Sequence, residues 1–267
     1  MPILFDLDGV FYQGSQAIEG GAEVALWVQK NNIPHLFITN TSSKPRSALL
    51  SKLASFGINT DESHIFTPPI ATAHWLRQQS LEHEIALFMP EATQADFAGF
   101  DIWQGGDKPV SAIIIGDLGE QWTFQVLNKA FRLLMQQSQP QFIALGMTRY
   151  WQAGDGLRLD VAPFIVALEY ATGIKAQVMG KPASAFFQSA IDILGSTAEQ
   201  TIMIGDDIQG DVAGAQNAGL QGVLVKTGKY RPDDLQQGIQ PDAILSSIRD
   251  LPEWWNQQSN LSQHKNE

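Results

Sequence analysis

The chain of 267 residues contains no cysteine, which excludes disulfide bonds, thiolate metal sites and redox chemistry on sulfur. Basic residues are scarce as well: 17 lysines and arginines stand against 28 aspartates and glutamates, and the formal net charge is −11. A surface this acidic repels a phosphate backbone, so we expect no nucleic-acid partner. A protein of this charge that handles an anionic substrate needs a local positive site.

Long hydrophobic runs are also missing. No stretch reaches the roughly 18 consecutive apolar residues of a membrane-spanning helix, and the first residues contain no basic segment ahead of a cleavage site. We therefore expect a soluble, cytoplasmic protein with no membrane partner. Hydrophobic residues make up 44% of the chain, which is enough for a sizeable core. The length allows one large domain or a core with a substantial insert.

Short apolar runs alternate with segments of helical periodicity, which is typical of parallel α/β proteins. Residues 2–5 form an apolar run that stops at Asp6, and residues 35–38 form another that stops at Thr39. The pattern over residues 21–30 between them is helical, so this part of the chain predicts a βαβ crossover. The sequence therefore predicts an α/β fold with a doubly wound parallel sheet.

A second α/β series occupies the middle of the chain. Its strands are followed by few of the acidic residues found after strands elsewhere, so we expect a separate inserted α/β domain. The boundaries that we predict are residues 1–78 and 179–267 for the core and residues 79–178 for the insert. Residues 149–160 are expected to be loop-rich, and the polar tail from residue 256 is expected to fray. The strands of the insert are expected over residues 85–89, 112–115, 142–145 and 176–179, and its helices over residues 124–137 and 161–171.

Four polar clusters stand at places where a doubly wound sheet binds its ligands, outside the carboxyl ends of the strands. Several carboxylates in one crevice repel one another unless a cation neutralises them, and ligands that are all oxygen favour magnesium over zinc. A hydroxyl and a lysine are suited to holding phosphate oxygens. The combination predicts a phosphoryl-transfer site. The clusters are Asp6-Leu7-Asp8-Gly9, Thr39-Asn40, Gly180-Lys181-Pro182, and Gly205-Asp206-Asp207 with Asp211 four residues further on.

In this order, the clusters resemble the motifs of the haloacid dehalogenase superfamily, whose phosphatase members carry Asp-x-Asp on the first strand, then Thr or Ser, Lys, and a pair of acids. The resemblance covers most of the chain, because the interval between Thr39 and Lys181 leaves room for the large α/β cap of subclass IIA. Residues 167–171, 203–208 and 226–231 are similar to a narrower group of phosphatases that act on phosphoamide and pyrophosphate bonds. Members of that group often have Ser at the position of Asp8.

The resemblance implies a magnesium-dependent phosphohydrolase in which Asp6 is the nucleophile and is transiently phosphorylated. Asp8 is then the general acid and base. The family pattern places the magnesium ion between the carboxylates of Asp6 and Asp206 and the backbone carbonyl of Asp8. Asp207 or Asp211 would orient the waters of the ion from nearby.

The resemblance also implies how the substrate is bound. Thr39, Asn40 and Lys181 would bind the non-bridging phosphate oxygens. The insert would be a specificity cap over a small phosphorylated metabolite, pyrophosphate or a phosphoamide. Relatives of this type often dimerise through the cap, which makes a homodimer possible, although the sequence itself does not determine the oligomeric state.

Each motif by itself has an ordinary structural explanation. Asp-x-Asp-Gly is a common turn, and Asp206 or Asp207 could only cap the following helix. Two alternative functions stay open beside the phosphatase. A hydrolytic dehalogenase would use Asp6 on carbon, but that chemistry needs neither Asp8 nor the acids of a magnesium site. A phosphate- or magnesium-binding regulatory module would not turn over substrate, and this chain is far longer than such a module.

Overall fold

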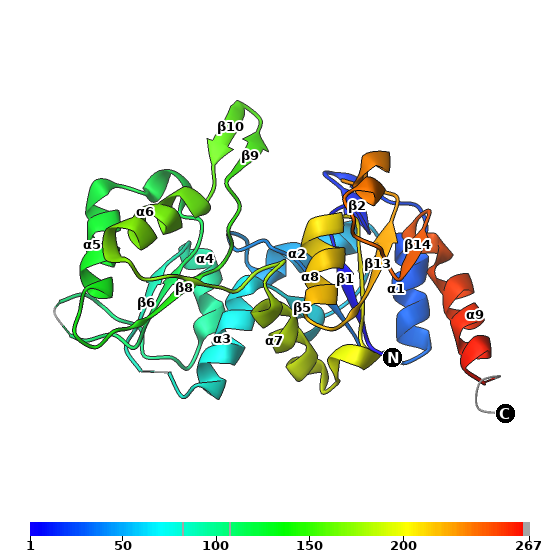
Figure 1. Cartoon of the computed structure of the whole chain (residues 1–267), viewed down its shortest axis with the longest axis horizontal. Coiled ribbons are helices and arrows are strands. Elements are labelled where there is room, and N and C mark those ends of the chain that lie inside the picture. The colour runs from blue at the N-terminus through cyan, green and yellow to red at the C-terminus, as the bar shows by residue number, and fades with distance from the viewer. Residues whose placement is uncertain (82, 107, 264–267) are drawn as a thin grey trace. The chain divides into compact units, whose positions relative to one another are not determined.

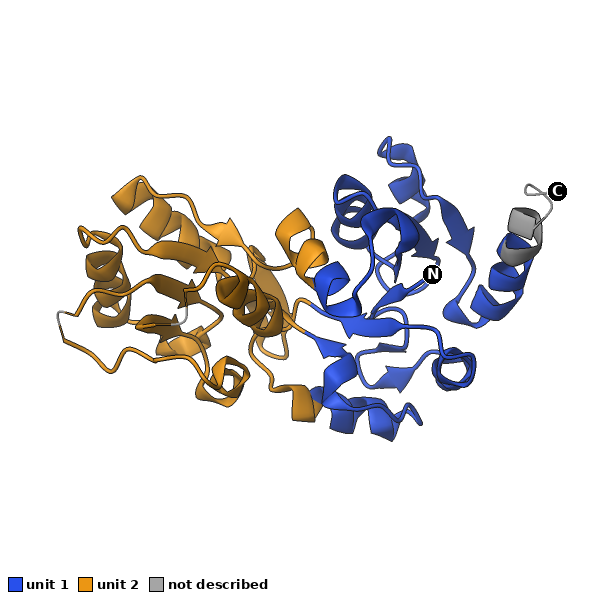
Figure 2. Ribbon diagram, turned by 90° about the horizontal axis from the view of Figure 1, so that it is seen from below, with its two compact units in different colours: residues 1–39, 49–66, 190–267 blue, residues 40–48, 67–189 orange. Residues whose placement is uncertain are grey.

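The structure is a computed structural model that describes residues 1–81, 83–106 and 108–263. The chain divides into two compact units (Figure 2). The first unit comprises residues 1–39, 49–66 and the chain from residue 190 onwards, and the second comprises residues 40–48 and 67–189. The domain boundaries expected from the sequence stay a prediction. Among the described residues, no helix combines the length and the apolar character needed to cross a membrane.

The first unit is built on a six-stranded sheet with the order β14-β13-β12-β1-β4-β5, in which all neighbours are parallel. Every residue of β1, β4 and β12 is buried, as expected for strands that helices cover on both faces. A short antiparallel pair, β2 and β3, follows β1. The strands are β1 (Ile3–Asp6), β2 (Tyr12–Gln13), β3 (Gln16–Ala17), β4 (His35–Ile38), β5 (Ile65–Phe66), β12 (Ile202–Gly205), β13 (Gln221–Val225) and β14 (Ala243–Leu245).

Two apolar clusters cover opposite faces of this sheet. Val223 and Val225 belong to the large cluster, which also holds residues of α1 and α9, whereas Leu224 between them packs with Ile208 and Val212. Since neighbouring side chains of a strand point to opposite faces, the sheet is doubly wound, as the sequence predicts (Figure 1). The helices are α1 (Gly21–Lys30), α2 (Arg46–Ser55), α7 (Ser184–Leu194), the π-helix η5 (Ile208–Ala213), α8 (Gly214–Asn217), α9 (Leu251–Gln263), and the short 3-10 helices η1 (Glu62–His64), η4 (Ala198–Gln200), η6 (Pro232–Gln236) and η7 (Ile248–Asp250).

The second unit has its own four-stranded parallel sheet with the order β11-β8-β7-β6. Its core joins side chains of β6, β7 and β8 to side chains of α5 and α6. The structure therefore confirms that the second α/β series forms a sheet of its own. The elements are α3 (Pro68–Gln78), β6 (Ile85–Phe88), α4 (Glu91–Gln94), η2 (Ala95–Phe97), β7 (Ala112–Ile115), η3 (Gly119–Gln121), α5 (Phe124–Leu134), β8 (Gln141–Ala144), β9 (Tyr150–Ala153), β10 (Gly156–Leu159), α6 (Ala162–Thr172) and β11 (Gln177–Val178).

Two segments differ from the sequence-based expectation. The expected loop over residues 149–160 contains the antiparallel hairpin of β9 and β10. The tail that was expected to fray from Asn256 continues α9 as far as Gln263. Trp254 and Trp255 pack this helix against the core of the first unit, which accounts for the longer helix.

Candidate active site

The acids and the threonine of the first unit gather at one edge of its sheet. In the pairing of β1 with β4, Asp6 lies opposite Ile38, so Thr39 follows one residue beyond. The strand β12 pairs with β1 on the other side and ends immediately before Asp206. Both Thr39 and Asp206 are buried. The parallel topology thus brings residues that are far apart in the sequence to the same end of three neighbouring strands.

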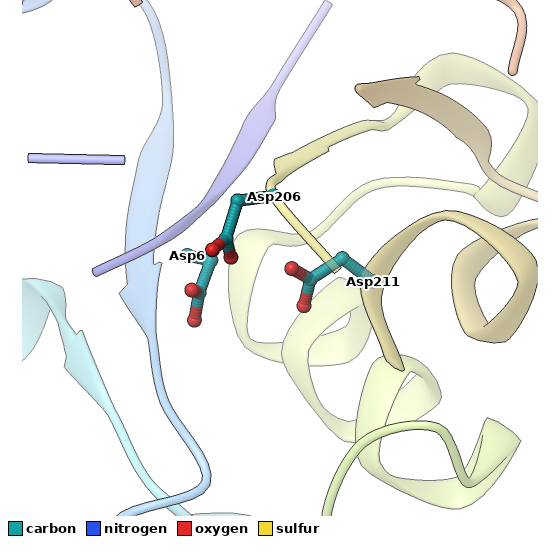
Figure 3. A group of neighbouring side chains, drawn as sticks. All are labelled: Asp6, Asp206 and Asp211. Atoms are coloured by element: carbon teal, nitrogen blue, oxygen red, sulfur yellow. The ribbon is translucent and has the colours of Figure 1, made fainter. Parts of the chain in front are cut away.

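Three carboxylates meet at this edge. Asp6, Asp206 and Asp211 each offer one oxygen such that all three oxygens lie within 4.8 Å of one another (Figure 3). Asp6 and Asp206 come from the ends of adjacent strands, and Asp211 faces them from η5. All three side chains are buried. Such a group of buried acids with only oxygen donors suits a hard divalent cation.

Asp206 has the most unusual environment of the three. Its side chain is fully buried, and one oxygen, Oδ2, accepts a hydrogen bond of 2.6 Å from the backbone N–H of Lys229. The other oxygen, Oδ1, has no hydrogen-bond partner among the described residues. Burial raises the pKa of Asp206 to about 7, the hydrogen bond from Lys229 opposes this shift, and the charges of Asp6 and Asp211 add to it. A buried oxygen without a partner beside two other acids fits a bound cation.

Glycines leave room for these carboxylates. Gly9 has a φ of +92°, and a Cβ at this position would collide with the carboxylate of Asp206. A Cβ at Gly205 would collide in the same way with the carboxylate of Asp211. The carboxylates of Asp206 and Asp211 therefore pack directly against the backbone of Gly9 and Gly205.

The loop that follows Asp6 and carries Asp8 is anchored by aromatic packing. Phe11 is buried, and its ring lies 5.4 Å from that of Phe5 and 5.2 Å from that of Phe37, edge to face in both cases. Such pairs contribute about 0.5–1.5 kcal/mol each beyond the burial of their area. Asp8, within the same loop, has an exposed side chain and is not part of the three-acid cluster. The anchored loop leaves this carboxyl group accessible to solvent.

Asp207 differs from its neighbour Asp206. Its carboxylate caps η5 by accepting the N–H groups of Gln209 and Gly210, at 3.1 and 2.9 Å, and it pairs with the ammonium group of Lys229 at 3.2 Å. Burial alone would raise the pKa of Asp207, but these hydrogen bonds and the charge of Lys229 outweigh it and lower the pKa. The capping explanation considered for the acid pair thus describes Asp207, whereas Asp206 joins the acid cluster.

Asn40 and Lys181 belong to the second unit, where they contact each other directly. The Asn40 side chain accepts the backbone N–H of Lys181 at 2.7 Å and donates to the backbone carbonyl of Lys181 at 2.9 Å. Gly180 allows this approach, since a Cβ there would lie only 3.0 Å from the carbonyl oxygen of Leu145 and 3.2 Å from Oδ1 of Asn40. The side-chain amide of Asn40 therefore fixes the backbone that carries Lys181.

Lys229 and Thr227 contact the acidic site, although the sequence did not identify them as functional residues. Thr227 donates its hydroxyl to the backbone carbonyl of Gly9, and Lys229 contacts Asp206 and Asp207. The available signal was their position: residues 226–231 follow directly after the buried strand β13, at the same end of the sheet as Asp6, Thr39 and Asp206.

Comparisons with known proteins agree with the resemblance described above. The family model of the haloacid dehalogenase-like hydrolases matches residues 3–102, and that of the HAD-hydrolase-like proteins matches residues 178–251. The human phospholysine phosphohistidine inorganic pyrophosphate phosphatase is 39% identical over 236 residues, which cover 87% of this chain and 85% of the relative. The bovine haloacid dehalogenase-like hydrolase domain-containing protein 2 is 38% identical over 244 residues, covering 91% of this chain and 90% of that protein.

A solved structure with the same fold is that of the p-nitrophenyl phosphatase from Archaeoglobus fulgidus. It is 28% identical to this chain, with a TM-score of 0.84, and the match covers 94% of this chain and 98% of that one. The similarity extends over both α/β units of the chain described here.

Proposed function

Since the chain belongs to the haloacid dehalogenase-like hydrolase family and is a phosphatase of that family, we propose that Asp6 is its nucleophile. We further propose that its phosphohydrolase activity depends on magnesium. The observation that carries the proposal is the buried cluster of Asp6, Asp206 and Asp211 at the end of the central strands. Asp6 sits where the first strand ends, which is the position of the nucleophile in the family pattern. A phosphoryl group at Asp6 would therefore lie beside the acids that favour a cation.

The reaction proceeds in two displacements. A carboxylate oxygen of Asp6 attacks phosphorus and forms an aspartyl phosphate, while Asp8 protonates the oxygen or nitrogen of the leaving group. Asp8 then takes a proton from a water molecule, which attacks phosphorus, so that inorganic phosphate leaves and the Asp6 carboxylate is restored. Such acid–base assistance contributes about 10²–10⁴ in rate. The exposed side chain of Asp8 suits a group that exchanges protons with substrate and water.

We assign magnesium to the acidic cluster because its donors are oxygens and because Oδ1 of Asp206 is buried without a partner among the described residues. The ligands proposed are the carboxylates of Asp6 and Asp206 and the backbone carbonyl of Asp8. Asp211, which lies within the cluster, is placed to orient waters of the ion, and Asp207 acts from further out through Lys229. When bound, the ion neutralises charge on the acids and on the transferred phosphoryl group.

The phosphate-binding groups proposed are the hydroxyl of Thr39 and the ammonium group of Lys181, with Asn40 contributing through its hold on the Lys181 backbone. The insert of residues 79–178 is the proposed cap. Its closure over the site would favour small soluble substrates.

The substrate class proposed is a small phosphorylated metabolite, pyrophosphate or a phosphoamide. The support is the similarity over most of the chain to a relative named for phospholysine, phosphohistidine and inorganic pyrophosphate. A homodimer is proposed as well, and sedimentation velocity of the full chain tests it.

The test is the release of inorganic phosphate from a panel of phosphoesters, pyrophosphate and phosphoamides, with magnesium and with a chelator, for the wild type and Asp6→Asn. We expect turnover that needs magnesium and is lost in the variant. Turnover of halogenated acids would instead favour the dehalogenase. A folded protein that binds phosphate and magnesium but turns over nothing in the panel would favour the regulatory module.

A further inference from the structure

The segment that follows β13 makes three separate contacts with the acidic site. The hydroxyl of Thr227 donates to the backbone carbonyl of Gly9 at 2.5 Å. The backbone N–H of Lys229 donates to Oδ2 of Asp206 at 2.6 Å, and its ammonium group pairs with Asp207 at 3.2 Å. Thr227 and Lys229 thus contact both the loop after β1 and the segment that follows β12.

Gly228, which lies between Thr227 and Lys229, is at a position with no room for a side chain. Gly228 has a φ of +59°, and a Cβ at this position would collide with the carboxylate of Asp206 and with the Cα of Gly9. The backbone of residues 227–229 therefore packs directly onto Asp206, in a conformation that favours glycine. This close approach is what allows the N–H of Lys229 to reach the carboxylate.

We propose that residues 227–229 are a positioning clamp for the cation site, which joins the loops of Gly9 and Asp206 and leaves Oδ1 of Asp206 as the oxygen that binds the ion. The inference rests on the proposed function, because it assigns a role toward the magnesium ion. The contacts divide the Asp206 carboxylate: Oδ2 is taken by the N–H of Lys229, and Oδ1 is buried without a partner among the described residues. Oδ1 is thereby the oxygen with no competing hydrogen bond from the described residues.

The clamp has a clear physical purpose. Without an ion, the ionised carboxylates of Asp6 and Asp206 repel each other, and contacts that join the segments after β1 and β12 oppose this repulsion. Groups that orient metal ligands from the outside typically change metal affinity or activity about 10–100-fold when they are removed. Thr227 is the residue to change, because its hydroxyl carries no charge. Loss of the Lys229 ammonium group would change the charge of the site as well as the position of the segment.

The experiment measures Mn²⁺ binding to the full chain without substrate, by electron paramagnetic resonance of the free ion. Thr227→Val should weaken binding about tenfold or more, and Thr227→Ser, which keeps the hydroxyl, should stay within about twofold of the wild type. Thr227→Ala removes the same hydroxyl without placing a methyl group beside the Gly9 carbonyl, and it should weaken binding as Thr227→Val does. A second readout is phosphate release, in which both variants should recover turnover at high magnesium concentration.

The matched control is Thr93→Val. Thr93 is a buried threonine of the second unit whose hydroxyl also donates to a backbone carbonyl, that of Pro90, and its loss should leave Mn²⁺ affinity unchanged. Wild-type affinity in folded Thr227→Val or Thr227→Ala would overturn the clamp, as would equal weakening in Thr93→Val. If the wild type itself neither bound Mn²⁺ nor released phosphate with magnesium, the proposed function would fail instead, so the two failures are distinct.

Discussion

The side chain of Asn40 forms a reciprocal pair of hydrogen bonds with the backbone of Lys181, 141 residues further along the chain. Both polar atoms of the amide are engaged, one as donor and one as acceptor. A sequence motif that was expected to bind phosphate through Asn40 therefore also fixes the segment of a second motif. The contact joins the two motifs directly, although the whole second α/β series lies between them in the sequence.

Replacing Asn40 by alanine removes both hydrogen bonds and frees the Lys181 segment. Each bond contributes about 0.5–1.5 kcal/mol, so we expect a lower melting temperature and a KM for small phosphorylated substrates that rises about tenfold. Asn256→Ala, at an exposed position of α9, is the control and should change neither quantity. Unchanged KM in a folded Asn40→Ala variant would show that the pair does not serve substrate binding.

The pKa of Asp206 makes the effect of magnesium depend on pH. Burial raises this pKa from its ordinary value of 3.8 to about 7, and the charges of Asp6 and Asp211 add to the shift. Between these values the folded, metal-free protein binds a proton that the unfolded chain does not, so Asp206 contributes stability that is lost as the pH rises through this window. Magnesium needs the ionised carboxylate and competes with that proton.

We therefore expect magnesium to raise the melting temperature more at about pH 8 than at about pH 5.5. The measurement is thermal unfolding with magnesium and with a chelator at both pH values. Asp206→Asn serves as the control for all other titrating groups, and it should show a small magnesium effect with little dependence on pH. An equal magnesium effect at both pH values in the wild type would contradict the assignment.

Asp207 is expected to affect stability more than catalysis. Its carboxylate caps η5 through two backbone N–H groups, and loss of such a cap costs about 0.5–2 kcal/mol. Asp207→Ala should lower the midpoint of urea unfolding, whereas Asp207→Asn should retain most of the stability because Asn caps about as well as Asp. The pair with Lys229 adds little, since that side chain is 70% exposed. The prediction fails if both variants unfold at the same urea concentration.

Asp8 gives the opposite combination of effects. Its side chain is exposed, so Asp8→Asn should leave the melting temperature unchanged. Turnover at saturating substrate and magnesium should fall about 10²–10⁴-fold, because the group that protonates the leaving group is lost. Asp233→Asn, another exposed acid, should retain full turnover. Comparable losses in the two variants would point to a general charge effect and away from acid–base catalysis by Asp8.

Much of the fold could be predicted because buried parallel strands are short continuous apolar runs. Residues 35–38 and 112–115 were expected as strands and form β4 and β7 without a shift. The hairpin of β9 and β10 could not be predicted in this way. Leu157 and Leu159 are 69% and 62% exposed, so the segment has no buried face to impose an alternating pattern.

The candidate site was predictable in its residue types but not in the direction of each side chain. Asp206 and Asp207 are neighbours in the sequence, and only the π-helical start of η5 decides that Asp207 caps the helix while Asp211 joins the acid cluster. The contacts of Thr227 and Lys229 depend on a close backbone approach at Gly228, which no local pattern reveals. The cytoplasmic location stays a prediction from the sequence.

The most direct test of the central claim is to trap the phosphoenzyme. The full chain is mixed with a substrate from the panel and magnesium, quenched in acid within the first turnover, and digested for mass spectrometry of the peptide that contains residue 6. We expect one phosphoryl group on Asp6 in the wild type, and neither label nor turnover in Asp6→Asn. Phosphate release by the wild type without label on that peptide, or undiminished turnover by Asp6→Asn, would contradict it.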